Sequence, residues 1–307
     1  MVYPQFYESQ RVGKLYAPDT AHAVEAGRTA GVASAATDVQ RIVLLLVDAQ
    51  VDFIPEDGSV SVPGAVADTR RTIEWIFRNV DRLTTIAASL DSHVPLQIFS
   101  PPWWINRQGE HPAPYTVIRS EDVKAGLWTP LYQPGWSSEY VEKLEETSRK
   151  ELMIWPYHTL IGTPGHSITP PLYEAIAYHA AARQTQPTFL SKGSIPETEH
   201  YSILEPEVKV PGQPLGGLNT AFLNMLASYD VIYIAGQAKS HCVLESVRSM
   251  MRYFQHHTDF IRKLHLLMDC TSSVAHPTID FDRMANETLE RYAGFGLQLV
   301  TSEDPLP

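Results

Sequence analysis

The sequence predicts an α/β protein with three layers, α/β/α, and a mostly parallel sheet of roughly six strands. The first observation is the segment 42–48, an apolar run that ends in an acid, which is typical of a strand buried on both faces of a parallel sheet. The second is that such runs alternate with helical patterns, the clearest being Ile73, Ile76, Phe77 and Val80. The third is composition: 44% of the residues are apolar and 19% are charged, which favours a packed core.

The predicted elements alternate along most of the chain. Strands are expected at 42–48, 84–90, 152–154, 188–190, 231–235, 264–268 and 297–300. Helices are expected at 73–80, 137–150, 171–183, 218–228, 243–254 and 281–293. Proline opens the third of these helices, where it is favoured at the first helical position, and Ser137 or Ser138 can cap the second. This order indicates βαβ units, and therefore a parallel sheet with helices on both faces.

Three segments fall outside the alternation. Residues 1–40 are aperiodic and rich in alanine and glycine, and we expect an arm on the surface that could reach a second subunit of a homo-oligomer. The remaining residues, 41–307, are expected to form a single domain. Within it, about 94–136 holds four of the six tryptophans among many prolines, and 205–217 is rich in proline and glycine. Both are expected to be long loops over the strand ends, as lids and interfaces often are.

Charge and hydropathy exclude several classes of protein. The net charge is 24 − 35 = −11, which argues against nucleic acid or an anionic membrane as the main partner. No apolar run approaches the roughly 18–20 residues that a membrane span needs. No signal peptide is visible in the first forty residues. Two cysteines are too few for a disulfide scaffold. We therefore expect a cytoplasmic protein that acts on a small molecule.

Chemically capable residues gather at the predicted strand ends. Asp48, Asp91, Lys192 and the turn 236–242 each follow a strand, so they should share one edge of the sheet, where ligands bind in such folds. Cys242 ends that turn and opens a helix, whose dipole stabilises a thiolate and whose N–H groups can hold an oxyanion. Taken alone, each residue has an ordinary structural explanation. Their convergence favours a thiol nucleophile with Asp48 as base, whereas Cys270 is assigned to packing.

A second group of residues has the chemistry of a metal site. Asp91 and His93 follow one strand, and His158 follows another. Two imidazoles and one carboxylate suit Zn²⁺, Fe²⁺ or Mn²⁺, and a three-ligand set leaves positions open for catalysis or ligand binding. The D-x-H spacing is weak evidence by itself, because twelve histidines produce accidental pairs.

Six motifs in order give the sequence a family resemblance. The matching segments are 48–53 (D-x-Q-x-D-F), 58–64 (G-S-x-x-V-P-G), 91–93 (D-x-H), 155–165 (W-P-x-H, then G-T-x-G), 191–193 and 236–243 (G-x-A-x-x-x-C-V). From about residue 42 to 304 the chain resembles the nicotinamidase branch of the isochorismatase-like cysteine hydrolases. The resemblance implies that family's Rossmann-like fold and the hydrolysis of a small amide, such as nicotinamide, to a carboxylate and ammonia.

The resemblance also implies roles for individual residues. Cys242 would be the nucleophile, Asp48 the general base and later acid, and Lys192 the cation beside both. Asp91, His93 and His158 would hold a divalent metal, zinc in the first place and iron or manganese as alternatives. A cis peptide bond would join Gln237 to Ala238, and the N–H groups of Ala238 and Cys242 would form the oxyanion hole. Phe53, Trp155 and Gln237 would line the substrate pocket.

Several residues depart from the family pattern. Thr159 stands in place of a cysteine, Lys239 in place of a threonine and Ser92 in place of an aromatic residue. The second histidine that many members carry about six residues after His93 is absent. His111 could replace it, but a loop histidine before a proline is more often only exposed. These departures leave two alternatives open. The same three residues could act on a carbamoyl or ureido compound, or the chain could be a non-catalytic binding protein on the same scaffold.

Overall fold

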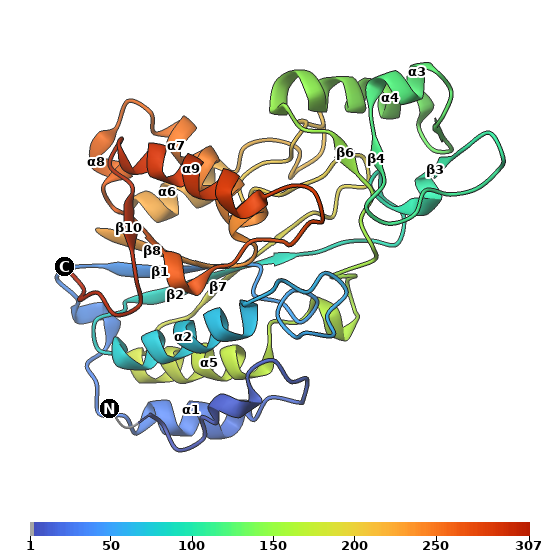
Figure 1. Cartoon of the computed structure of the whole chain (residues 1–307). Helices are drawn as coiled ribbons and strands as arrows, with labels where there is room; N and C mark the ends of the chain where they lie inside the picture. Colours follow the sequence, from blue (N-terminus) through green and yellow to red (C-terminus); the bar gives the residue numbers. More distant parts are fainter. Residues whose placement is uncertain (1–2) are drawn as a thin grey trace.

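The computed structural model describes residues 3–307 and is built around one six-stranded parallel sheet (Figure 1). The strand order is β10-β9-β8-β1-β2-β7. The strands are β1 (Ile42–Val47), β2 (Thr85–Asp91), β7 (Thr188–Lys192), β8 (Val231–Gly236), β9 (Leu264–Leu267) and β10 (Gln298–Val300). This architecture confirms the predicted three-layer α/β/α fold.

Both faces of the sheet are covered because its central strand is apolar throughout. All six residues of β1 are buried: Ile42, Leu44 and Leu46 pack into one core cluster, and the residues between them pack into the other. The first face carries α2 (Ala65–Arg78) and α5 (Pro170–Arg183). The opposite face carries α6 (Thr220–Ala227), α7 (Leu244–Tyr253), α8 (Thr258–Ile261) and α9 (Phe281–Ala293).

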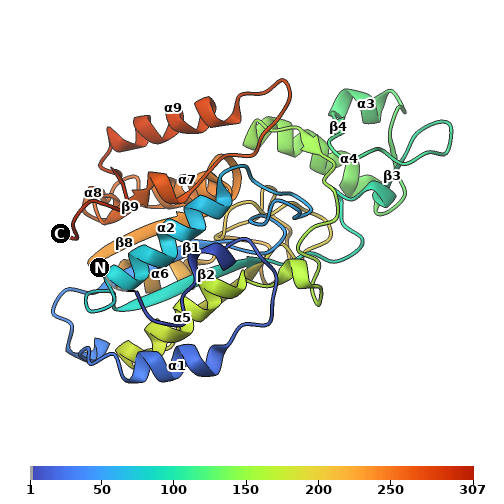
Figure 2. The same ribbon diagram turned by 60° about the horizontal axis from the view of Figure 1, so that its bottom comes forward.

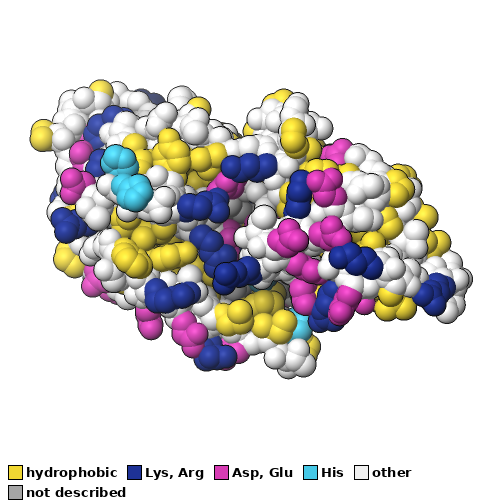
Figure 3. All heavy atoms as spheres, turned by 90° about the horizontal axis from the view of Figure 1, so that it is seen from above, with side chains coloured by type: hydrophobic (Ala, Val, Ile, Leu, Met, Phe, Trp, Pro, Cys, Tyr) yellow, Lys and Arg dark blue, Asp and Glu magenta, His cyan; other side chains and the backbone are white. Residues whose placement is uncertain are grey.

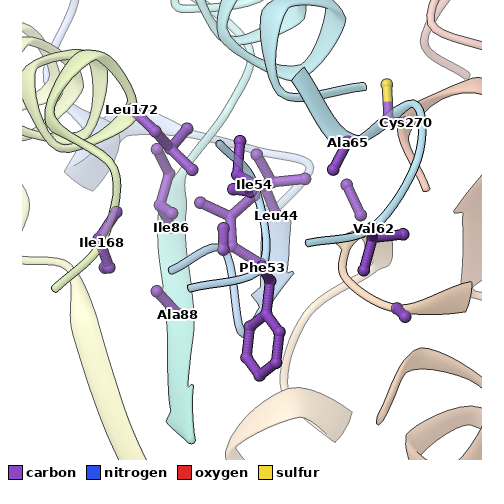
Figure 4. Packing of buried hydrophobic residues seen from close by; sticks show 14 of the residues in the cluster. Leu44, Phe53, Ile54, Val62, Ala65, Ile86, Ala88, Ile168, Leu172 and Cys270 are labelled. Atoms are coloured by element: carbon purple, nitrogen blue, oxygen red, sulfur yellow. The ribbon is translucent and has the colours of Figure 1, made fainter. Parts of the chain in front are cut away.

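Figure 4 shows how the first core cluster approaches the carboxyl edge of the sheet. Leu44 of β1 and Ile86 of β2 lie near Leu172 of α5. The ring of Phe53 lies at one end of this group, beyond Leu44. Because Phe53 also lines the cavity described below, the packing of the core fixes one wall of that cavity.

The segment 1–40 is not the aperiodic arm that the sequence predicted. Its described part contains α1 (Thr20–Arg28) and the short helical turns η1 (Ser9–Arg11) and η2 (Ala35–Thr37); residues 1–2 lie outside the described part. Helix α1 packs along α5, as both views show (Figures 1 and 2). Phe6, Val12 and Ala23 join the core of the same chain. The prediction missed this helix because α1 exposes most of its surface and buries only Ala23 and Gly27.

The segment 94–155 forms a lobe beside the sheet rather than a plain loop (Figure 2). It holds η3 (Pro101–Trp103), β3 (Trp104–Ile105), β4 (Val117–Ile118), α3 (Ser120–Lys124), β5 (Thr129–Pro130), α4 (Pro134–Lys143), a π-helical turn η4 (Leu144–Ser148) and β6 (Leu152–Met153). The predicted strand at 152–154 therefore exists, but it pairs antiparallel with β4 outside the main sheet. The predicted helix 137–150 is shorter and ends in the π turn. We call residues 94–155 the insertion lobe.

The surface seen in Figure 3 carries acidic and basic side chains interspersed with apolar ones. Among residues 3–307, no helix is long and apolar enough to cross a membrane.

Candidate active site

Parallel strand pairing brings the predicted site residues to one edge of the sheet. Asp91 and Lys192 are the last residues of β2 and β7 and face each other in register. Asp48 directly follows β1, and Gly236 ends β8 in register with Val47. Four segments distant in sequence therefore meet at the carboxyl ends of four neighbouring strands, where this fold class binds ligands.

The ammonium of Lys192 joins the two carboxylates. Its Nζ lies 2.9 Å from Asp48 Oδ2 and 2.8 Å from Asp91 Oδ1, and it donates a third bond of 2.8 Å to the carbonyl of His200. The side chain is 1% exposed. Burial alone would lower the pKa of Lys192, but the two carboxylates raise it, so the residue stays charged.

Asp48 lies fully buried at the end of β1, with φ at +44°. Its Oδ1 accepts a 2.6 Å hydrogen bond from Ser89 Oγ on β2. Burial raises the pKa of Asp48, and this effect exceeds the lowering effect of Lys192. A carboxylate with a raised pKa is a stronger base, which suits a group that must accept a proton from a thiol.

Cys242 lies on the π-helical turn η6 (Lys239–Val243), which continues into α7. Its Sγ is 3.7 Å from Lys192 Nζ. Burial raises the pKa of the thiol well above its usual value, although Lys192 acts in the opposite direction. Stabilisation of the thiolate by the helix N-terminus stays a prediction. Because burial favours the neutral thiol, Cys242 needs a base within reach.

The turn before Cys242 contains the cis peptide bond Gln237–Ala238 that the resemblance implies. Within residues 3–307, the backbone N–H of Ala238 has no acceptor, which leaves it free to bind an oxyanion. The side chain of Gln237 does not line the cavity, contrary to the expectation. Its amide instead donates to Asp68 Oδ2 at 2.9 Å and accepts from the backbone of Ser272 at 3.2 Å, so Gln237 holds the turn in place.

Asp91, His93 and His158 form a buried cluster whose ligand atoms all lie within 4.8 Å of one another. The Nε2 atoms of His93 and His158 lie 2.9 Å and 3.7 Å from Asp91 Oδ2. Each Nδ1 lies against a backbone carbonyl, that of Gly193 at 3.1 Å and that of Pro156 at 2.7 Å. These carbonyls direct the Nε2 atoms toward the centre of the cluster, as in metal-binding histidines.

The donor set therefore fits a divalent metal. Burial, together with His93, lowers the pKa of His158 to about 4, so its imidazole is neutral and can ligate near pH 7. His111 is not part of the described cluster; its Nδ1 lies 2.7 Å from the carbonyl of Trp104 in the insertion lobe. His111 is exposed and does not replace the missing histidine.

The residues that depart from the family pattern have structural partners. Ser92 Oγ is 2.8 Å from His166 Nε2. The backbone N–H of Thr159 donates to Asp52 Oδ2 at 2.6 Å, and Lys239 forms a 2.8 Å ion pair with Asp282. None of the three departures removes a group from the thiol, lysine and carboxylate arrangement.

A cavity of about 500 Å³ opens above Cys242 and the metal-ligand cluster. Phe53 and Trp155 line it, where the sequence expected them. Residues that the sequence did not suggest also line it: Val60, Val62, Phe99, Glu199, His200, Tyr201, His241 and Val274. Glu199 to Tyr201 belong to the irregular segment after β7, where no periodicity marks which side chains turn inward. Val60 and Val62 lie within the motif 58–64, and this motif was the one feature of the sequence that could have indicated that they line the cavity.

Comparisons with known proteins agree with this architecture. No family model matches the sequence, and no curated protein matches it. Among solved structures, the yeast nicotinamidase bound to the inhibitor nicotinaldehyde is similar, with a TM-score of 0.57, 17% identity and coverage of 85% of this chain and 99% of that chain. A nicotinamidase and pyrazinamidase of Acinetobacter baumanii has a TM-score of 0.55, 16% identity and coverage of 88% and 100%. An L. infantum structure in complex with nicotinate has a TM-score of 0.51, 18% identity and coverage of 88% and 96%.

The sheet and its flanking helices define an α/β/α protein whose candidate site lies at the carboxyl edge of a parallel sheet. More particularly, the fold is that of the nicotinamidases, as the resemblance implied.

Proposed function

We propose that the chain is a cysteine amidohydrolase that converts a small amide, nicotinamide in the first place, to a carboxylate and ammonia. The observation that carries the proposal is the contact of Lys192 with both Asp48 and Cys242: a thiol, a carboxylate and a cation meet beneath one cavity. The nicotinamidase fold supports the same activity. A non-catalytic binding protein would not need to bury these three groups together, at the cost of desolvating two charges.

In the first half of the proposed reaction, Asp48 accepts the proton of the Cys242 thiol and the sulfur attacks the carbonyl carbon. Lys192 stabilises the developing thiolate. The N–H of Ala238, together with that of Cys242, holds the oxyanion. When the tetrahedral intermediate collapses, the C–N bond breaks and the protonated Asp48 gives its proton to the departing nitrogen. Ammonia leaves, and the acyl group remains on sulfur as a thioester.

In the second half, a water molecule attacks the thioester carbonyl. Asp48 accepts a proton from this water, and the C–S bond breaks. The carboxylic acid is released and Asp48 returns its proton to the Cys242 sulfur, which restores the thiol. One amide and one water thus give one carboxylic acid and one ammonia, which exchange a proton in solution to become carboxylate and ammonium. Asp48 acts in turn as base, acid, base and acid, which its raised pKa favours.

Asp91, His93 and His158 would hold a divalent metal beside the cavity. A bound metal would supply Lewis-acid binding of a substrate donor atom, such as a ring nitrogen. The chain's own contribution is to keep the imidazole of His158 neutral and to direct both imidazoles toward Asp91.

The test is ammonia release by purified protein from nicotinamide and from a panel of carbamoyl and ureido compounds. Cys242→Ala should reduce the rate to the uncatalysed background, because it removes the thiol that attacks the carbonyl. Cys270→Ala is the matched control, since Cys270 is a buried thiol in the core and does not line the cavity. Turnover by the Cys242→Ala protein at the wild-type rate would contradict the mechanism. Turnover of a ureido compound but not of nicotinamide would keep the mechanism and change the substrate.

A further inference from the structure

Glu199 is a buried carboxyl in the cavity wall that the proposed mechanism does not use. Glu199 is 2% exposed and lines the cavity. Glu199 Oε1 accepts hydrogen bonds from Tyr201 Oη at 2.5 Å and from Trp155 Nε1 at 3.1 Å. Glu199 Oε2 accepts a weaker one of 3.3 Å from Tyr140 Oη on α4. Trp155 Nε1 can only donate and both tyrosine hydroxyls can donate as well, so this environment suits an ionised carboxylate.

No cation of the described chain forms an ion pair with this carboxylate. Lys150 lies nearby, with its Nζ 5.0 Å from the centre of the Tyr201 ring, but this Nζ pairs with Glu207 at 2.7 Å and with Glu245 at 3.0 Å. Burial raises the pKa of Glu199 to about 7; the nearby carboxylate of Glu207 adds to the rise, and the hydrogen bonds from Tyr201 and Trp155 and the charge of Lys150 oppose it. Buried charges in proteins are ordinarily paired, so an unpaired one in the wall of a ligand cavity indicates that the ligand brings the opposite charge.

The surroundings of the carboxylate are aromatic. The indole of Trp155 lies edge-on to the rings of Tyr201 and His241, with centroids 6.5 Å and 5.6 Å away. His241 is neutral, because burial lowers its pKa to about 3. Aromatic faces next to a carboxylate form the arrangement that binds organic cations, through ring quadrupoles and a charge-assisted hydrogen bond.

From the unpaired carboxylate of Glu199 and the aromatic rings around it, we propose that this wall of the cavity binds a cationic nitrogen of the substrate. The preferred substrates are then small amides that carry an ammonium or a similar cationic group away from the scissile bond. Glu199 is the residue that determines this specificity. The inference rests on the proposed function in that the same cavity hydrolyses the amide, and it places amides that carry a cationic group ahead of uncharged ones such as nicotinamide.

The experiment compares two isosteric amides, meta-(aminomethyl)benzamide and meta-ethylbenzamide, which differ by an ammonium in place of a methyl group. Binding is measured by calorimetry on the full-length Cys242→Ala protein, and kcat/KM on the unmutated enzyme, both at about pH 8, where Glu199 is ionised and the amine is largely protonated. The ammonium compound should bind at least about tenfold more tightly, since hydrogen bonds to charged groups are about twice as strong as neutral ones. Glu199→Gln should bring the ratio close to one.

The matched control is Glu197→Gln, two residues away, whose carboxylate bonds to Gln133 in the insertion lobe and does not line the cavity. It should leave the ratio unchanged. Equal binding of the two amides by the protein with Glu199 intact would overturn the inference, and this comparison needs no variant at Glu199 that must fold. An unchanged ratio in Glu199→Gln would overturn it as well. Absence of turnover with every amide would contradict the proposed function instead, and the calorimetric ratio would still decide the inference.

Discussion

The glycine after the proposed catalytic lysine gives the sharpest test of how closely the site is packed. Gly193 has φ at +82°, a region that side chains other than glycine rarely adopt. A Cβ at this position would lie 2.6 Å from Asp91 Oδ1 and 2.9 Å from His93 Cε1. We therefore expect Gly193→Ala to displace the carboxylate that pairs with Lys192 and belongs to the metal-ligand cluster.

The magnitude follows from two contributions. Left-handed backbone at a non-glycine residue costs about 1–2 kcal/mol. Loss of the 2.8 Å bond between Lys192 and Asp91 adds about 1.5–3 kcal/mol, the usual contribution of a hydrogen bond to a charged group. The matched control is Gly109→Ala in the insertion lobe, because φ there is +85° and a Cβ would meet no atom of residues 3–307 within 4 Å. That variant should lose only the backbone contribution.

Urea denaturation of the wild-type protein and both variants measures the free energy of unfolding. Gly193→Ala should lose about 2.5–5 kcal/mol and Gly109→Ala about 1–2 kcal/mol. Ammonia release should fall in the first variant and persist in the second. Equal losses of stability in the two variants, with the activity of Gly193→Ala intact, would refute the close packing of Gly193 against Asp91.

Three further predictions concern charged groups of the site. Lys192→Met should lower the free energy of unfolding by about 3–5 kcal/mol in urea denaturation, because it leaves the buried carboxylates of Asp48 and Asp91 without a counterion; a loss below about 1 kcal/mol would contradict the ion pairs. Asp91→Asn should weaken the binding of Zn²⁺, measured by competition with a chromophoric chelator, whereas His111→Ala should leave it unchanged. Glu199 binds more protons in the folded state than in the unfolded state, because its pKa is raised from 4.5 to about 7, so its contribution to stability falls as the pH rises through that window. Glu199→Gln should thus gain up to about 3 kcal/mol relative to the wild-type protein between pH 4.5 and pH 8, and a constant difference across this range would contradict the raised pKa.

The sheet edge could be predicted from sequence because its chemistry depends on strand ends. An apolar run reveals where a buried strand lies, and parallel pairing then brings the residue after one strand beside the residue after the next. Asp48 follows such a run and Asp91 ends another, whereas Lys192 ends the mostly exposed edge strand β7, in register with Asp91. The prediction that these three residues lie together therefore did not depend on the conformation of any loop. The rise in the pKa of Cys242 could not be predicted, because it depends on how completely the surrounding side chains exclude water.

The insertion lobe could not be predicted for the opposite reason. Its strands have two residues each, which is too short for an alternation of apolar and polar residues to be recognised. In addition, β6 pairs with β4 rather than with the main sheet. Helix α1 was not predicted because its contact with α5 is narrow and buries only the small residues Ala23 and Gly27, which leave no apolar pattern in the sequence. In each case tertiary contacts, rather than a local pattern, determine the structure.

The two parts of the site consequently have different origins and should respond differently to substitution. The residues proposed to break and form bonds lie on the regular sheet edge, where neighbouring strands fix their positions. The wall around Glu199 combines Tyr140 and Trp155 from the insertion lobe with Tyr201 from the segment after β7, and hydrogen bonds between side chains hold it together. Changes at the sheet edge should therefore lower kcat for every amide, whereas changes in the wall should alter the ratio of kcat/KM between amides. A chain could keep the proposed chemistry and acquire a different substrate by changing the lobe and the segment after β7, because these supply the wall around Glu199 and none of the proposed catalytic groups.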